Sequence, residues 1–180
     1  MFGMVSELLN KNHETSKRRL KIRRYKVIPL SQKSGVIEWC DNTIPLGEWL
    51  VGDNGGAHSK YNKNDMLFSD CRRLLHNATD NSTTKQSRND AYMKICENFK
   101  PVFRHFFTEN FLDPKIWYQN RLNYIKSVAT SSIVGYVVGL GDRHVQNILI
   151  DKNTAEVIHI DLGVAFDQGK ILPTPGKLRN

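Results

Sequence analysis

The segment Gly139-Leu-Gly-Asp-Arg-His-Val-Gln-Asn147, with His159-Ile-Asp-Leu-Gly163 shortly after it, decides the fold of this chain. The first three residues are expected to end an apolar helix, because glycine is a poor helix former, and a polar loop follows. Two apolar runs, Ile148 to Ile150 and Val157 to Ile160, flank the turn-forming Asp151-Lys-Asn-Thr154 and predict a strand hairpin. The second strand runs directly into the Asp-Leu-Gly triplet. The predicted order is therefore helix, polar loop, strand, turn, strand and Asp-x-Gly.

The polar residues of this segment have the spacing that phosphoryl transfer requires. A carboxylate must orient the attacking hydroxyl group, and oxygen ligands must hold Mg²⁺ against the phosphates. In protein kinases, the loop HRDLxxxN places a metal-binding Asn five positions after the catalytic Asp, and a second metal-binding Asp follows in DFG. Asp142 and Asn147 have the same five-residue offset, and Asp161 follows the strand pair. Each residue alone would be read as a cap or a structural group, so the prediction rests on their joint spacing.

The histidine lies after the Asp-Arg pair rather than before it, and this order resembles the catalytic loop of the phosphatidylinositol 3-kinase superfamily. Further segments are similar to the ATM-like branch of its related protein kinases: Ser127 to Tyr136, Val164 to Pro175, Tyr25 to Gly35 and Glu38-Trp39-Cys40. The similarity weakens over residues 52–89 and in the last five residues.

The resemblance implies an α+β, protein-kinase-like bilobal fold that is truncated at both ends. Residues 1–39 would be the C-terminal part of the small lobe, from the end of helix C to the hinge. Residues 40–180 would be a large-lobe fragment that includes the catalytic loop and the start of the activation segment.

The resemblance also assigns roles to the residues of the loop. Asp142 would be the catalytic carboxylate, and His144 would stabilise the transferring phosphoryl group or assist proton transfer. Arg143, counted with the catalytic residues, would brace the loop rather than touch substrate. Asn147 and Asp161 would hold Mg²⁺ or Mn²⁺.

By the same resemblance, ATP would lie in a slot between the lobes. The segment Ile37 to Cys40 would form the hinge, and Trp39 would stack on or border the base, although Trp39 could instead be a core residue. An apolar slot with a few polar groups suits a nucleotide base. The expected nucleotide-binding residues are Glu38, Trp39, Cys40, Leu149 and Ile160.

The chain departs from the family at both ends. No Gly-rich phosphate loop, strand lysine or acidic partner on the following helix can be located, and the pattern changes after Pro173-Thr-Pro175. We therefore expect a partial gene product whose isolated chain transfers no phosphate. The resemblance implies a nuclear, homodimeric parent that phosphorylates Ser or Thr followed by Gln, and that meets a DNA-break sensor complex through regions absent here.

Composition fits a soluble intracellular protein. The chain has 180 residues, a hydrophobic fraction of 39% and a formal net charge of +8. No run approaches the roughly 18 apolar residues of a membrane span, so no membrane partner is expected. Three scattered cysteines, Cys40, Cys71 and Cys96, favour a reducing compartment over a disulfide framework. The basic run Lys17 to Lys26 alternates with apolar residues and is interpreted as a strand with a solvated face.

Three other functions compete with a protein kinase. A lipid kinase of the same superfamily would carry a basic cluster in its activation segment, whereas Asp167, Gln168 and the lone Lys170 offer none. A truncated, non-catalytic product would bind partners or nucleotide without turnover. A nucleic-acid-binding module would rest on the basic run and the net charge alone.

The remaining sequence predicts helices and polar connections. A hairpin is expected from Leu20 to Leu30 and Val36 to Trp39. Gly52 to Asn64 is expected to be a surface loop, and Asn77 to Asn89 a mobile stretch. Asp113 should cap a helix with Pro114 at its first position. Helices are expected at Met4 to Asn10, Pro45 to Leu50, Asp65 to His76, Asp90 to Phe99 and from Pro114 past Ile125, with a buried helix over Val128 to Val138.

Overall fold

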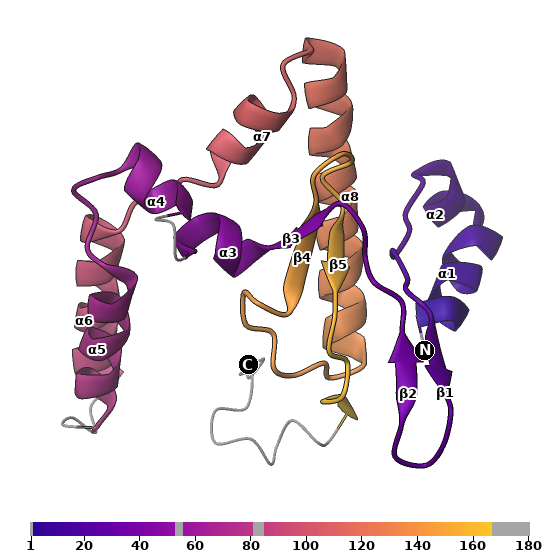
Figure 1. Ribbon diagram of the computed structural model, residues 1–180, viewed down its shortest axis with the longest axis horizontal. Coiled ribbons are helices and arrows are strands. Elements are labelled where there is room, and N and C mark those ends of the chain that lie inside the picture. Colours follow the sequence, from indigo (N-terminus) through magenta and orange to yellow (C-terminus); the bar gives the residue numbers. More distant parts are fainter. Residues whose placement is uncertain (1, 53–55, 81–84, 167–180) are drawn as a thin grey trace. The chain divides into compact units, whose positions relative to one another are not determined.

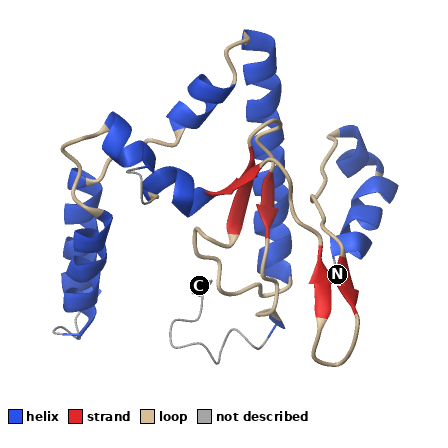
Figure 2. Cartoon of the chain, in the orientation of Figure 1, coloured by secondary structure: helices blue, strands red, loops and turns tan. Residues whose placement is uncertain are grey.

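The computed structural model describes residues 2–52, 56–80 and 85–166 (Figures 1 and 2). The chain divides into two compact units. Unit 1 contains Met1–Gly47 and Phe107–Asn180, and unit 2 contains Glu48–Phe106. None of the helices in the described residues combines the length and the apolarity that crossing a membrane requires.

Unit 1 opens with two helices and a hairpin. Helix α1 (Phe2–Lys11) is followed by α2 (His13–Lys17), and Asn12 caps α2 by accepting hydrogen bonds from the backbone N–H groups of Glu14 and Thr15. Strands β1 (Val27–Pro29) and β2 (Gly35–Ile37) pair antiparallel. The predicted hairpin is therefore present, but both of its strands are shorter than expected.

The basic run is not the strand that the sequence predicted. Residues 20–26 have no regular secondary structure, and β1 begins only at Val27. Arg23 and Lys21 instead direct their charged groups at the carboxylates of Asp151 and Glu156. These ion pairs fix the segment through its side chains and leave its backbone outside any sheet.

A three-stranded antiparallel sheet lies at the centre of unit 1. Its order is β3 (Thr43–Pro45), β4 (Ile148–Asp151), β5 (Val157–His159). Ile150 and Ile158 are almost fully buried and supply its core. The β4–β5 hairpin matches the prediction, whereas β3 was not foreseen. Pro45, expected in the first turn of a helix, ends β3, which is an edge strand where the missing N–H of proline is tolerated.

Helix α8 (Pro114–Val137) packs on this sheet as one continuous helix of 24 residues. Asp113 caps it as predicted, because its Oδ1 accepts hydrogen bonds from the N–H groups of Lys115 and Ile116 at 2.9 and 3.0 Å. The expected burial of its apolar C-terminal part is wrong in part, since Ile133 is 60% exposed. The buried residues of α8 are Asn120, Ser127, Thr130 and Ser131.

Small hydroxyl side chains can be buried in α8 because the helix itself satisfies them. The hydroxyl of Ser127 donates to the carbonyl of Tyr124 at 2.9 Å, and that of Thr130 donates to the carbonyl of Lys126 at 2.7 Å. A buried hydroxyl with a hydrogen-bond partner avoids most of the desolvation cost. A polar stripe therefore replaces the apolar face that the composition of residues 128–138 suggested.

Unit 2 is helical in its described residues. It includes α4 (Gly56–Tyr61), α5 (Phe68–Asp80) and α6 (Lys85–Asn98), while α3 (Leu46–Val51) and α7 (Arg104–Asn110) cross its boundaries. The rings of Trp49, Phe103 and Phe106 pack with centroids 5.6 Å apart.

Two expectations for unit 2 were wrong in part, because both ranges contain helical residues. Helix α4 occupies residues 56–61 of the predicted loop from Gly52 to Asn64, and residues 53–55 lie outside the described residues. The predicted mobile stretch from Asn77 to Asn89 is largely the end of α5 and the start of α6, with residues 81–84 outside the description. Both predictions rested on polar composition alone. Polar residues also form helices when one face of the helix packs against another element.

Replacing Gly139 by alanine should destabilise unit 1. Helix α8 ends in a Schellman motif, in which Leu140 N–H bonds the carbonyl of Gly135 and Gly139 N–H bonds that of Tyr136. Gly139 has a φ of +59°, and a Cβ there would lie 3.1 Å from the carbonyl oxygen of Phe166. We expect Gly139→Ala to lower the free energy of unfolding by about 1–2 kcal/mol in urea denaturation. Gly135→Ala is the control, because its Cβ meets only ordinary contacts and should be neutral or stabilising.

The buried pair of His58 and Asp65 should make the stability of unit 2 depend on pH in acid. His58 Nδ1 lies 2.7 Å from Asp65 Oδ2, and both side chains are about nine-tenths buried. Burial acts to raise the pKa of Asp65, but hydrogen bonds from His58, Asn62 and the Lys100 N–H lower it below its usual value. A depressed folded-state pKa gives stability that is present above about pH 4 and is lost as the pH falls through the folded-state value.

Asp65→Asn should therefore reduce the free energy of unfolding at pH 7 by about 1–3 kcal/mol and flatten its dependence on pH below about 4. Thermal denaturation at pH 7 and pH 3 measures both effects. Asp90→Asn, at an exposed position of α6, should change neither by more than about 0.5 kcal/mol. An unchanged acid profile in Asp65→Asn would show that the pair with His58 does not stabilise the fold.

Candidate active site

Two aspartates near the predicted catalytic loop have an unusual backbone conformation: Asp142, between α8 and β4, and Asp161, after β5. Asp142 has a φ of +54°, and Asp161, which follows β5, has a φ of +52°. Positive φ is uncommon for residues other than glycine, although Asp tolerates it better than most. Such conformations cluster at functional sites, where the surrounding structure determines them.

Arg143 ties the loop to the end of β5. Its Nε donates to the carbonyl of Gly141 at 2.8 Å, its Nη1 to that of Ile160 at 2.7 Å, and its Nη2 to that of Asp161. Burial lowers the pKa of the guanidinium group, while the charges of Asp161 and Asp142 raise it. Arg143 thus bonds the main chain at Gly141 and at the end of β5.

Main-chain hydrogen bonds bring Asn147 beside Asp161. The N–H of Ile160 donates to the carbonyl of Asn147 at 3.1 Å, and Asp161 is the next residue. The side chain of Asn147 is buried, and its Nδ2 donates to the carbonyl of Asp142 at 3.1 Å. This bond uses the amide nitrogen, so the amide oxygen is the atom available to a metal ion.

His144 lies next to the carboxylate of Asp142. Its Nε2 is 3.9 Å from Asp142 Oδ1, and both side chains are about half exposed. Its Nδ1 accepts a hydrogen bond from the N–H of Gln146 at 3.2 Å. In the neutral ring the proton is therefore on Nε2, the nitrogen nearer the carboxylate.

All five residues predicted to bind the nucleotide line one cavity of about 390 Å³. Its volume falls within the range of small-molecule sites. Trp39 lines it yet is 84% exposed, so the alternative that Trp39 is a core residue is wrong. The cavity is lined by Glu38, Trp39, Cys40, Leu149 and Ile160, together with Tyr25, Ile37, Thr43, Pro45 and Asp161.

Tyr25, like Thr43 and Pro45, lines this cavity although it was not among the predicted site residues. Tyr25 lines both this cavity and a second cavity of about 600 Å³, and Asp161 also lines both. Burial raises the pKa of Tyr25, the charges of Cys40 and Asp161 raise it further, and Arg143 lowers it. The sequence around Tyr25 shows only an aromatic residue just before a predicted strand, which does not indicate that it lines a cavity.

Burial favours the uncharged form of two groups of unit 1: Cys40, which lines the cavity, and His159, which lies in β5. Burial raises the pKa of the Cys40 thiol, and the charges of Glu38 and Asp41 add to this against the opposing effect of Arg23. Burial and the charge of Arg143 lower the pKa of His159. Its Nδ1 is buried with no hydrogen-bond partner among the described residues, which is consistent with an uncharged ring.

The donor set fits Mg²⁺ that is shared with a nucleotide. No group of three or more His, Cys, Asp or Glu residues in the described part of the chain could hold a metal ion. Asn147 and Asp161 offer one amide and one carboxylate. Mg²⁺ commonly takes one or two protein carboxylates and completes its shell with water and substrate phosphates.

Comparison with known proteins shows which family this chain belongs to. The model of the family described as phosphatidylinositol 3- and 4-kinase matches residues 1–178. The chain belongs to this family. It is 55% identical over 175 residues to the serine-protein kinase ATM of Sus scrofa, and 49% identical over 175 residues to the serine/threonine-protein kinase tel1 of Schizosaccharomyces pombe.

Solved structures of the phosphatidylinositol 3- and 4-kinase family show the same fold. The structure described as the FAT and kinase domain of CtTel1 matches with a TM-score of 0.88 and 48% identity, over 97% of this chain and 12% of that one. The fold is thus that of the catalytic domain of this family, as predicted. Each of these two alignments covers 97% of this chain but only 6% of the curated relative.

Arg143→Lys should loosen the site, because a lysine ammonium cannot reproduce a fork that bonds three separate carbonyls. We expect a loss of about 1–3 kcal/mol in unfolding free energy and faster hydrogen exchange at the N–H of Ile160. Arg121→Lys, at an exposed position of α8, should change stability by less than about 0.5 kcal/mol. Equal stability and exchange in Arg143→Lys and the unaltered chain would contradict the bracing role.

Proposed function

We propose that this site binds Mg–ATP and belongs to an ATP-dependent serine/threonine protein kinase. The observation that carries the proposal is the position of Asp161, which lines the same cavity as the five expected nucleotide-binding residues. A metal ligand at the edge of an apolar slot is where the phosphates of a bound nucleotide need charge stabilisation. The names of the curated relatives, all kinases of Ser or of Ser and Thr, favour a protein over a lipid acceptor.

The proposed roles follow the chemistry of each group. Asp142 orients the attacking hydroxyl group and accepts its proton. His144 donates from Nε2 and stabilises charge on the transferring phosphoryl group. Asn147 and Asp161 hold Mg²⁺ or Mn²⁺, which when bound neutralises charge on the phosphates. Arg143 acts through the backbone that it braces.

We further propose a division into two lobes, a class of acceptor residue and a cellular role. Residues 1–39 would be small-lobe and 40–180 large-lobe structure. The acceptor would be Ser or Thr followed by Gln, and the role nuclear signalling of DNA double-strand breaks through a sensor complex. A solved relative is described as a complete CtTel1 dimer with C2 symmetry, which supports a homodimeric parent.

The nucleotide site is tested by titrating trinitrophenyl-ATP into the purified chain with and without Mg²⁺. We expect saturable binding that ATP displaces and that Mg²⁺ strengthens. Asp161→Asn should weaken the Mg²⁺-dependent binding by about 10-fold or more, since even outer-shell partners of a metal are worth about that much. Asp113→Asn is the matched control, because it removes a carboxylate elsewhere in unit 1 and Asn caps helices as well as Asp.

Binding that is independent of Mg²⁺ and unchanged in Asp161→Asn would refute the metal-nucleotide site. Phosphate transfer is measured in the same samples with a Ser-Gln peptide, its Ser-Ala counterpart and phosphatidylinositol vesicles. The isolated 180 residues are expected to transfer no phosphate. Transfer that Asp142→Ala abolishes would overturn that expectation and identify Asp142 as the catalytic carboxylate, and the preferred acceptor would distinguish a protein kinase from a lipid kinase.

A further inference from the structure

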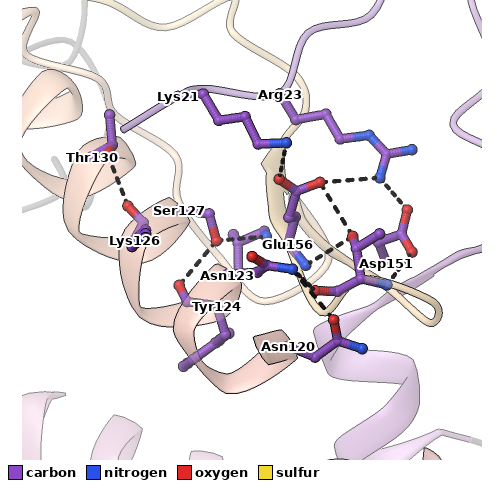
Figure 3. A network of polar contacts seen from close by, with 12 residues as sticks. Lys21, Arg23, Asn120, Asn123, Tyr124, Lys126, Ser127, Thr130, Asp151 and Glu156 are labelled. Carbon is purple, nitrogen blue, oxygen red and sulfur yellow. Dashed lines mark hydrogen bonds and ion pairs between the residues drawn. The ribbon is translucent and has the colours of Figure 1, made fainter. Parts of the chain in front are cut away.

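The turn of the β4–β5 hairpin is held from two sides by polar side chains (Figure 3). On one side, α8 supplies Asn120, whose Nδ2 donates to the carbonyl of Asn153 at 2.8 Å. It also supplies Ser127, whose hydroxyl oxygen accepts the N–H of Val157 at 3.0 Å. On the other side lies the irregular segment of residues 20–26, which the kinase chemistry leaves without a role.

Two basic side chains of this segment form ion pairs with carboxylates at the turn. Arg23 Nη1 donates to Asp151 Oδ2, and Lys21 Nζ lies 2.6 Å from Glu156 Oε1. The side chains of Asp151 and Glu156 are only 5% and 9% exposed, whereas that of Lys21 is 66% exposed. Arg23, whose side chain is 32% exposed and also lies 3.9 Å from Glu156, is therefore the better-enclosed cation of the two.

Asp151 occupies a position where a missing partner would be costly. Its Oδ1 accepts the N–H groups of Asn153 and Thr154 at 2.8 and 2.9 Å, which closes the turn, and its Oδ2 faces Arg23. Burial acts to raise the pKa of Asp151, but Arg23 and the two N–H groups lower it below the usual value. The carboxylate is ionised at neutral pH, and Arg23 supplies its compensating charge.

The same short segment carries Tyr25, two residues after Arg23. Tyr25 lines the nucleotide cavity together with Asp161, Leu149 and Ile160, which all belong to the β4–β5 hairpin or follow it. The hairpin thus presents its turn to Arg23 and its open end, next to Asp161, to Tyr25. Only one residue separates Arg23 from Tyr25. The contact of Arg23 with Asp151 therefore limits where Tyr25 can lie relative to Asp161.

We propose that Arg23 is a positioning residue of the nucleotide site: its ion pair with Asp151 fixes residues 20–26 on the hairpin and so sets where Tyr25 stands against Asp161. The nucleotide readout of this role rests on the proposed function. Arg23 then has a structural role within the fold, whereas other cations of the same run, such as Arg18 and Lys21, are largely exposed to solvent.

The test compares Arg23→Gln, Arg23→Lys, Asp151→Asn and the double variant Arg23→Gln/Asp151→Asn. Arg18→Gln is the control, because it removes the same charge from the same run at a 71% exposed side chain. Trinitrophenyl-ATP titration with Mg²⁺ gives the dissociation constant and the number of sites. Fluorotyrosine labelling with ¹⁹F NMR reports the surroundings of Tyr25, and Tyr25→Phe identifies its signal among the six tyrosines.

We expect Arg23→Gln and Asp151→Asn each to raise the dissociation constant by about 5-fold, the equivalent of one hydrogen bond. The number of sites should stay the same, and the ¹⁹F signal of Tyr25 should move toward its solvent value. The double variant should be no worse than either single one, because the pair acts as a unit. Arg23→Lys should recover most of the affinity. In a Tyr25→Phe background, Arg23→Gln should add less than 2-fold.

A merely structural role gives a different pattern: fewer sites, an unchanged dissociation constant and an unmoved Tyr25 signal. That pattern would overturn the proposal, as would a full effect of Arg23→Gln in the Tyr25→Phe background. The NMR signal separates this proposal from the proposed function. A Tyr25 signal that moves in Arg23→Gln and returns in Arg23→Lys supports the positioning role of Arg23 even where the chain binds no nucleotide, and such a chain refutes the nucleotide site alone.

Discussion

The antiparallel pairing of β4 with β5 is the constraint on which the rest of unit 1 depends. It sets Ile148 opposite His159 and Ile150 opposite Val157, with Ile150 and Ile158 buried as the core. A shift of one residue would turn these side chains to the opposite face, so the register is strongly determined. Asn147 immediately precedes β4, and Asp161 lies two residues after β5. The pairing of the strands therefore sets the separation of the two candidate metal ligands, with no direct bond between them.

The hairpin also explains why unit 1 buries so many polar groups. Carboxylates and hydroxyls gain little net stability when buried, because desolvation offsets most of their attraction. They do impose direction, since a hydrogen bond is satisfied in few arrangements. Asn120, Ser127 and Arg23 each bond a specific atom of the turn or its flanks. A purely apolar contact would allow α8 and residues 20–26 to slide along the hairpin, whereas these bonds allow one position each.

The sequence predicted the parts of the site that repeat a spacing and missed those that depend on tertiary partners. The strands β4 and β5 and the capped start of α8 are local patterns, and the structure has them. The polar stripe on α8 was missed because Ser127 and Thr130 look neutral until their helix carbonyls are counted as partners. The path of residues 20–26 was missed because the charges that fix it lie at Asp151 and Glu156, more than a hundred residues away. Tyr25 was missed for the same reason.

The hydrogen bonds of Arg143 leave the carboxylates of Asp142 and Asp161 to other partners. Arg143 is close enough for the charges of Asp142 and Asp161 to shift its pKa, yet its three hydrogen bonds go to main-chain carbonyls. An arginine paired bidentate with either carboxylate would neutralise it and occupy its oxygens. By holding the carbonyls of Gly141 and Asp161, the guanidinium group instead fixes the positive-φ backbone at both aspartates while leaving their carboxylates to other partners. The positive charge of Arg143 reduces the repulsion between the carboxylates of Asp142 and Asp161. The cost of holding the two residues in place lies in their positive-φ backbone conformation.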